Sequence, residues 1–255
     1  MNILAIETAT ESCSVALSLD GAVLERSSLA PRQHAEKLLP WIRDLLAEAG
    51  ASLQDLDALA FSRGPGSFTS LRIGIGVAQG LAWGARIPVV PVSSLQSVAQ
   101  AAAAAHGVAS AVVALDARMD EVYCGQYQAD EHGLMQPAGE ERVCAPTELL
   151  LDDPAAWTGV GNGFERYPEL AALAGRLQAV YAEVWPSSAR PAGSWPSTGW
   201  PATPCCPPSR PSPYTCATRW PINQLNLLTG ARWAGPASLY GRAAHCTARH
   251  AARAG

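Results

Sequence analysis

Hydrophobic and polar residues alternate along the first thirty positions in a way that predicts an antiparallel start. Residues 3–6 form a short apolar run, and residues 12–19 alternate apolar with small or polar side chains. This period of two is typical of a half-buried strand. Asp20 and Gly21 form a hairpin turn signal, and residues 22–29 are the expected returning strand. The chain therefore begins with three strands.

Longer helical patterns and short apolar runs follow in alternation. Helices are expected at 34–49, 69–83 and 94–105, and strands at 57–62 and 87–92. Pro40 lies inside the first helical pattern, where it should kink the helix or mark a restart. The resulting order, β-β-β-α-β-α-β-α, indicates an α/β fold.

A second series of elements resembles the first. Strands are expected at 111–115, 121–128, near 143 and at 157–160, a short helix at 146–151 and a longer one at 164–174. The strands at 111 and 121 repeat the spacing of those at 3 and 12, which suggests a duplicated half with an incomplete second copy. We therefore divide the chain into residues 1–106, 107–190 and 191–255.

The last 65 residues have a composition unlike the rest. They contain no Asp, Glu or Lys, but ten of the 20 Pro, four of the eight Trp and four of the seven Cys. A disordered Pro-rich linker is one interpretation, although linkers stay unfolded through low hydrophobicity and seldom carry so many Trp. The alternative is a displaced reading frame. Shifting the codons of residues 214–220 by one nucleotide permits Val-His-Leu-Arg-Asp-Lys-Val, with Leu-Pro before it.

Residues 1–190 carry all 22 acidic residues and 12 of the 18 basic ones, a formal charge of −10. We do not expect them to bind a nucleic-acid backbone unaided, because phosphate contacts need clustered Lys and Arg. We see no signal peptide, and no segment is apolar over the ~20 residues of a membrane span. Isolated Cys13, Cys124 and Cys144 fit a reduced, cytoplasmic protein without membrane contact.

Two turns that follow strands are candidates for anion binding. Glu7, Thr8 and Thr10 occupy the turn where sugar kinases, Hsp70 and actin bind phosphate and metal; backbone N–H groups there can hold an anion and a carboxylate can hold Mg²⁺ through water. An ordinary hairpin with satisfied hydroxyls is the alternative. Residues 64–69 lack the P-loop and dinucleotide patterns, so either an anion at a helix N-terminus or a capped turn is possible.

The helix at 69–83 contains glycines that need an explanation. Gly74, Gly76 and Gly80 should each cost about 1 kcal/mol relative to Ala. Gly76 and Gly80 are four residues apart and share a face, flanked by Ala78 and Ala82. Such a face allows another backbone to come close, either this chain's own sheet or a partner's helix. The first helix, apolar on more than one side, favours the partner.

Other chemical candidates are weaker. His34 lacks the second and third ligands of a zinc site, so we expect no metal. Asp116 and Asp120 follow a strand and could be acid–base residues or part of a solvated loop. Residues 159–163 could line a phosphate or form a strand-to-helix turn.

Several segments resemble the TsaB (YeaZ) family. They are residues 3–10, 34–40, 63–74, 78–82, 93–95, 116–118 and 161–163. The resemblance covers about residues 1–190, and the block at 63–82 is highly specific. The reading Leu-Pro-Val-His-Leu-Arg in the displaced frame is also similar to the closing segment of this family.

The resemblance implies an actin-like, sugar-kinase-like (ASKHA) α/β fold of two half-domains with mixed sheets, the second incomplete. It implies a non-catalytic scaffold for a TsaD-like transferase, joined by a TsaE-like ATPase, in threonylcarbamoylation of adenosine 37 of tRNA. The chain itself would need no cofactor, because ATP and metal belong to the partner subunits, and it would meet tRNA only within the complex. The helices at 34–49 and 69–83 would form the partner surface, which homodimers also use. Its residues would be His34, Leu38, Leu39, Ile42, Leu46, Thr69, Leu71, Arg72, Ile73, Gly76 and Gly80.

Two enzymes are the alternatives to this scaffold. One is a phosphotransferase that uses Glu7, Thr8 and Thr10, which the scaffold would retain only as a vestigial nucleotide site. The other is an M22-type glycoprotease-like metallopeptidase. The paired His that hold the metal in TsaD are missing from residues 1–190, which speaks against protease or transferase activity.

Overall fold

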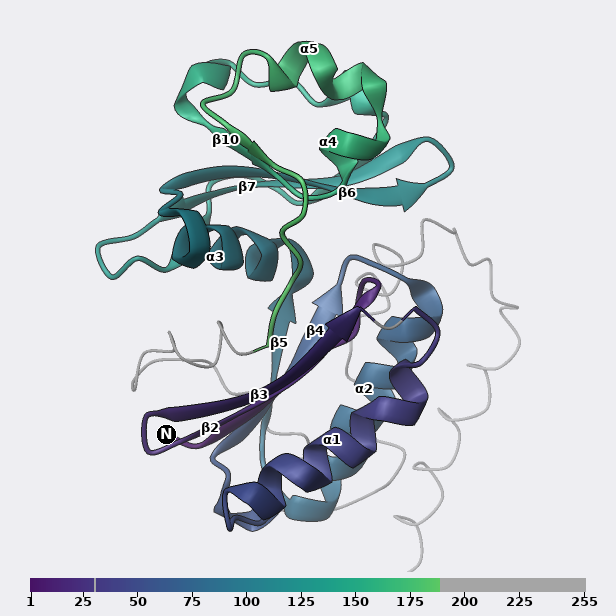
Figure 1. The fold of residues 1–255 in the computed structure, drawn as a ribbon, viewed down its shortest axis with the longest axis vertical. Coiled ribbons are helices and arrows are strands. Elements are labelled where there is room, and N and C mark those ends of the chain that lie inside the picture. The colour runs from purple at the N-terminus through teal and green to yellow at the C-terminus, as the bar shows by residue number, and fades with distance from the viewer. Residues whose placement is uncertain (30, 189–255) are drawn as a thin grey trace, which may run out of the picture. The chain divides into compact units, whose positions relative to one another are not determined.

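The computed structural model describes residues 1–29 and 31–188. The tail predicted for residues 191–255, whether a disordered linker or the product of a displaced reading frame, lies outside the described residues. Figure 1 shows two β-sheets with their helices. The elements of the first half are β1 (Ile3–Glu7), β2 (Ser12–Leu19), β3 (Ala22–Leu29), α1 (His34–Glu48), β4 (Ala58–Gly64), α2 (Phe68–Ala85), β5 (Val89–Ser93) and α3 (Ser94–His106). Those of the second half are β6 (Ser110–Arg118), β7 (Glu121–Ala129), β8 (Met135–Pro137), β9 (Arg142–Cys144), β10 (Thr158–Val160), α4 (Gly163–Arg166), α5 (Ala171–Ala174) and β11 (Val180–Tyr181).

The two sheets share one strand order. The first runs β3-β2-β1-β4-β5 and the second β8-β7-β6-β10-β11, with β9 also pairing with β7. In each sheet the first three strands of this order are antiparallel and the remaining two run parallel to the central strand. The predicted duplication and mixed sheets are confirmed. The second copy is reduced: β8, β9 and β10 have three residues each and β11 has two.

Proline has effects that the sequence pattern did not predict correctly. Helix α1 continues through Pro40 from His34 to Glu48, so of the two alternatives, a kink or a restart, the restart is wrong; Pro40 lies on the exposed side of the helix. The helix predicted at 164–174 is wrong as one element. It is divided into α4, a 3-10 turn at Pro168–Leu170 and α5, because Pro168 lacks an N–H and disfavours helix at the residue before it.

Strand β2 is buried on both of its faces, so the prediction of a half-buried strand is wrong. Its pairing with β3 through a two-residue turn is confirmed, with Asp20 and Gly21 both at positive φ. One face of β2 packs against α1. The other carries Ser14, Ala16 and Ser18, which are small enough for a close neighbour. Ser188 donates its backbone N–H to Ser14 Oγ (3.0 Å) on this face.

Helix α3 follows the first sheet in the chain but packs mainly on the second. Leu95, Val98, Ala99 and Ala102 of α3 join the core cluster of β6, β7 and β10. Figure 1 shows α3 against one face of the second sheet and α4 and α5 against the other, whereas α1 and α2 cover one face of the first. The two halves are therefore joined by α3 and by the segment that ends at Ser188.

Candidate functional site

The turn between β1 and β2 has its polar groups engaged within the chain. Glu7 is buried, and its Oε1 accepts the Ala9 N–H at 2.6 Å. The Thr8 N–H donates to Ser62 Oγ (3.2 Å), and Thr8 Oγ1 donates to the carbonyl of Ser70 at 3.0 Å. The backbone N–H groups of Thr8 and Ala9, which could have bound an anion, thus donate to acceptors within the chain.

The loop before α2 lies directly on this turn. The Ser67 N–H donates to the Ala9 carbonyl at 2.7 Å, and a Cβ on Gly66 would collide with that carbonyl. Thr10 Oγ1 accepts the Ser12 N–H at 3.2 Å, and the Thr10 carbonyl contacts His34 Nε2 at 3.1 Å. The predicted nucleotide residues therefore serve to join β1, β2, α1 and α2.

Burial raises the pKa of Glu7 to about 7, although hydrogen bonds from Ala9, Ser62 and Thr8 act in the opposite direction. A carboxylate that holds Mg²⁺ has to be ionised. Close to neutral pH, Glu7 is only partly ionised. Its environment is that of a buried structural carboxyl group.

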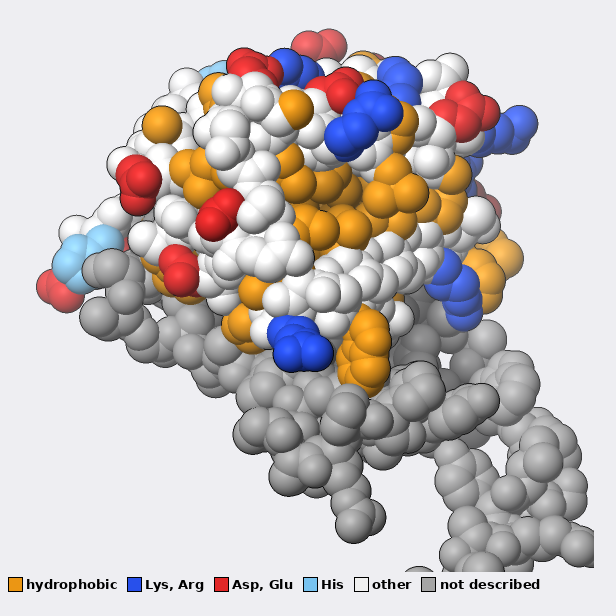
Figure 2. Space-filling view, turned by 90° about the horizontal axis from the view of Figure 1, so that it is seen from below, with side chains coloured by type: hydrophobic (Ala, Val, Ile, Leu, Met, Phe, Trp, Pro, Cys, Tyr) orange, Lys and Arg blue, Asp and Glu red, His pale blue; other side chains and the backbone are white. Residues whose placement is uncertain are grey.

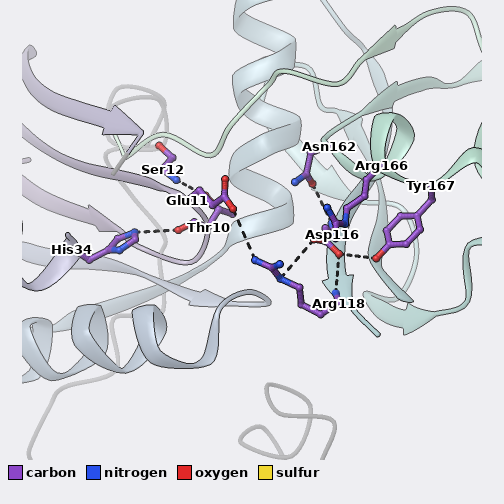
Figure 3. Close-up of polar contacts among 9 residues, drawn as sticks. All are labelled: Thr10, Glu11, Ser12, His34, Asp116, Arg118, Asn162, Arg166 and Tyr167. Carbon is purple, nitrogen blue, oxygen red and sulfur yellow. Dashed lines mark hydrogen bonds and ion pairs between the residues drawn. The ribbon is translucent and has the colours of Figure 1, made fainter. Parts of the chain in front are cut away.

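The corresponding turn of the second half is organised around Asp116, as Figure 3 shows. Its side chain accepts hydrogen bonds from the Tyr167 hydroxyl (2.6 Å) and the Arg118 N–H (2.9 Å), and it forms an ion pair with Arg166 Nε at 3.1 Å. The Asp116 N–H donates to Asn162 Oδ1 at 3.1 Å. Asp116 is thus no part of a solvated loop. Asp120 is exposed at the tip of the hairpin.

This cluster contains residues that sequence reasoning missed. Arg166 and Tyr167 are about fifty positions from Asp116, and no local spacing relates them. Their only sequence signal was the glycine-containing turn at 161–163. Added Cβ atoms on Gly161 and Gly163 would both approach the Ala114 carbonyl closely, so these glycines let α4 start beside β6 and bring Arg166 to Asp116.

The residues predicted for the partner surface divide into two groups. Five of them are buried, namely His34, Leu38, Ile42, Leu46 and Leu71. Thr69, Arg72, Gly76 and Gly80 on α2 and Leu39 on α1 are exposed, and Ile73 is half-buried. Only the second group can contact another molecule while the first half keeps this structure.

The glycines of α2 serve two purposes. A Cβ on Gly74 would collide with Thr8 Oγ1, so Gly74 permits contact with this chain's own turn. Among the described residues, added Cβ atoms on Gly76, Gly80 and Gly84 would meet nothing within 4 Å. Ala78 and Ala82, expected beside the open face, are instead fully buried. The exposed glycine stripe of α2 (Gly76, Gly80 and Gly84) therefore faces outward.

Apolar side chains accompany this stripe. Phe68 is 54% exposed, Trp83 39% and Leu39 51%. The guanidinium of Arg72 lies 3.2 Å from the centroid of the Phe68 ring and donates to the Phe68 carbonyl. Figure 2 views the molecule from below Figure 1 and shows hydrophobic side chains gathered near the centre, with both basic and acidic side chains around them. We call Leu39, Phe68, Arg72, Trp83 and the exposed glycine stripe the α2 surface.

The described part of the chain contains neither a candidate metal site nor a candidate membrane span. Within residues 1–29 and 31–188, no group of three or more His, Cys, Asp or Glu side chains could hold a metal ion. In the same ranges, no helix is long and apolar enough to cross a membrane.

Comparisons with known proteins agree with one another. The family model of TsaD, tRNA N6-adenosine threonylcarbamoyltransferase, matches residues 26–181. The tRNA threonylcarbamoyladenosine biosynthesis protein TsaB of Escherichia coli K12 is 47% identical over 178 residues, which cover 69% of this chain and 77% of that protein. TsaB of Haemophilus influenzae is 42% identical over 180 residues, covering 66% and 75%.

A solved structure is also similar to this chain, and it belongs to the same family as the relatives above. YeaZ from Pseudomonas aeruginosa is 45% identical, with a TM-score of 0.69, over 76% of this chain and 89% of that chain. The expected actin-like α/β fold is confirmed. This chain therefore belongs to the TsaB (YeaZ) family.

Proposed function

We propose that this chain acts in the biosynthesis of threonylcarbamoyladenosine on tRNA, as a non-catalytic partner of a TsaD-like transferase. Its relatives carry the name of that biosynthesis. The partner docks on the α2 surface, which also serves a homodimer. A TsaE-like ATPase joins the complex, and ATP, metal and tRNA are bound by the other subunits.

The observation that carries this proposal is the exposed glycine stripe of α2. Each of its glycines costs about 1 kcal/mol in a helix interior relative to Ala. Within residues 1–29 and 31–188, no atom lies where their side chains would be, so packing within this part of the chain gives no reason for them. A second helix laid along the stripe can approach the backbone closely and bury the neighbouring apolar side chains.

The pair Phe68 and Arg72 adds to the surface. Aromatic and Arg side chains are enriched among the residues that dominate binding energy. Arg72 holds the ring of Phe68 while about half of that ring stays exposed. A side chain that is already ordered loses less entropy on binding.

Binding of a purified TsaD-like subunit tests the proposal. We expect Gly76→Leu and Gly80→Leu to weaken binding about 100-fold each, because a leucine would separate the two helices. The matched control is Ala104→Leu, which enlarges an exposed small residue on α3. Titration calorimetry gives Kd for all three variants.

Folding of the variants must be compared as well. Replacing an exposed helical glycine should leave thermal stability equal or higher. Unchanged affinity in both Gly76→Leu and Gly80→Leu would rule out the α2 surface as the docking site. If Ala104→Leu weakened the affinity for the TsaD-like subunit equally, the loss of binding would not be specific to the α2 surface.

A further inference from the structure

A chain of hydrogen bonds crosses between the two halves beside the start of α3. Arg63 Nη2, on β4, donates to Glu141 Oε2 at 2.9 Å, and the Tyr127 hydroxyl, on β7, donates to Glu141 Oε1 at 2.7 Å. Ser93, where β5 meets α3, lies beside the Tyr127 hydroxyl. We call Arg63, Ser93, Tyr127 and Glu141 the clasp.

Each half supplies two members of the clasp. Arg63 and Ser93 come from the first half, and Tyr127 and Glu141 from the second. Tyr127 is fully buried, the side chain of Glu141 is 19% exposed and that of Arg63 is 38% exposed. The contact best shielded from water is therefore the hydrogen bond from Tyr127 to the carboxylate, and a charge-assisted bond of that kind is stronger than one at the surface.

A glycine on β7 makes room for the Tyr127 side chain to reach Glu141. Gly125 lies two residues before Tyr127 on the same face of β7. A Cβ at that position would come within 3.0 Å of the Tyr127 ring and hydroxyl. The missing side chain therefore lets the ring lie along the strand toward the Glu141 carboxylate.

The first half connects the clasp rigidly to α2. Arg63 is followed within five residues by the start of α2 at Phe68. Gly66 and Gly74 pack against Ala9 and Thr8 with no spare space. A shift of Arg63 would therefore move this loop, the β1–β2 turn and the start of α2 together.

We propose that the clasp holds the end of β4 and the start of α2 in a fixed position relative to the second half. The two halves then behave as one rigid body, without hinge motion at the clasp. The second half thereby controls the position of Phe68 and Arg72, although it contributes no residue to the α2 surface. The clasp requires no partner and can be tested on the isolated chain.

A second ion pair between the halves provides the control. Arg118 lies 3.9 Å from Glu11, and both side chains are largely exposed. Exposed pairs of this kind contribute little. Glu11→Gln should therefore have no effect where Glu141→Gln has a large one.

Hydrogen exchange of the full chain, read by mass spectrometry with residue-level fragments, tests the clasp. The amides of Ser67, Leu71 and Ala138 are hydrogen-bonded on the two sides of it. We expect Glu141→Gln to raise their exchange rates about tenfold, the effect of losing one hydrogen bond to a charged group. Amides of α1 should not change, and Glu11→Gln should match the parent chain at all of these positions.

The clasp is refuted if Glu141→Gln leaves the three amides within about twofold of the parent, because loss of a charged hydrogen bond must exceed that. If Glu141→Gln speeds exchange at all amides, that variant is generally destabilised and cannot test the clasp by itself. Tyr127→Phe is then the deciding variant, because it removes only the hydroxyl that donates to Glu141. A rise confined to the three amides in Tyr127→Phe supports the clasp. A uniform rise or no rise in that variant refutes it.

Discussion

Gly66→Ala is expected to destabilise the first half by about 3 kcal/mol, at the upper end of the range for overpacking a close contact. The added methyl would collide with the backbone of Ala9, which cannot move aside as a flexible side chain can. Relief of the collision requires the loop to leave the turn, and the hydrogen bond from the Ser67 N–H to the Ala9 carbonyl is then lost. Urea unfolding followed by circular dichroism measures the change.

Gly76→Ala is the matched control for this prediction. Its methyl would meet no atom of the part of the chain that the structure describes within 4 Å, and Ala favours a helix over Gly by about 1 kcal/mol. Stability should therefore rise by up to about 1 kcal/mol. If the two alanine variants have the same stability, the close packing of Gly66 on Ala9 is wrong.

Glu7 is expected to make stability fall as the pH rises from about 4.5 to 8. Its folded-state pKa is raised from 4.5 to about 7 by burial. The folded chain thus binds this proton more tightly than the unfolded chain does. The contribution is complete below pH 4.5 and is lost as the pH passes through about 7; a shift of this size corresponds to about 3 kcal/mol.

Glu7→Gln isolates this effect, because it keeps an acceptor for the Ala9 N–H but cannot ionise. The free energy of unfolding of both proteins is measured at several pH values between 4.5 and 8. The parent should lose stability relative to the glutamine variant over this interval. A constant difference between the two proteins would show that Glu7 does not titrate with a raised pKa.

Local patterns were sufficient for most of the elements in the first half. The alternation at 12–19 and the Asp20–Gly21 turn predicted β2 and β3, and the helical periods predicted α1, α2 and α3 to within a few residues. These signals are short-range, since strand and helix periods appear in consecutive residues. The second half was harder because β8, β9, β10 and β11 have only two or three residues each and Pro168 divides the predicted helix.

The sequence predicted which segments form helices and strands better than it predicted which side of each element is buried. Period and composition showed that α1 is apolar on more than one side, but not which side is covered. The structure places Leu38 and Ile42 against the first sheet and leaves Leu39 exposed. Likewise, Gly74 and Gly76 look alike in sequence, yet one contacts Thr8 and the other nothing.

The sequence by itself determined the α/β class, the repeated spacing of strands that suggests two similar halves, the family resemblance and the unusual glycine content of α2. Those features depend on local period, composition and motif spacing, all of which are present in the unfolded chain. Only the tertiary structure decided which glycines face outward, that Arg166 and Tyr167 bind Asp116, and that Arg63 reaches Glu141 78 residues away. Contacts of that kind are set by how the sheets and helices pack together, and no spacing between consecutive residues encodes them.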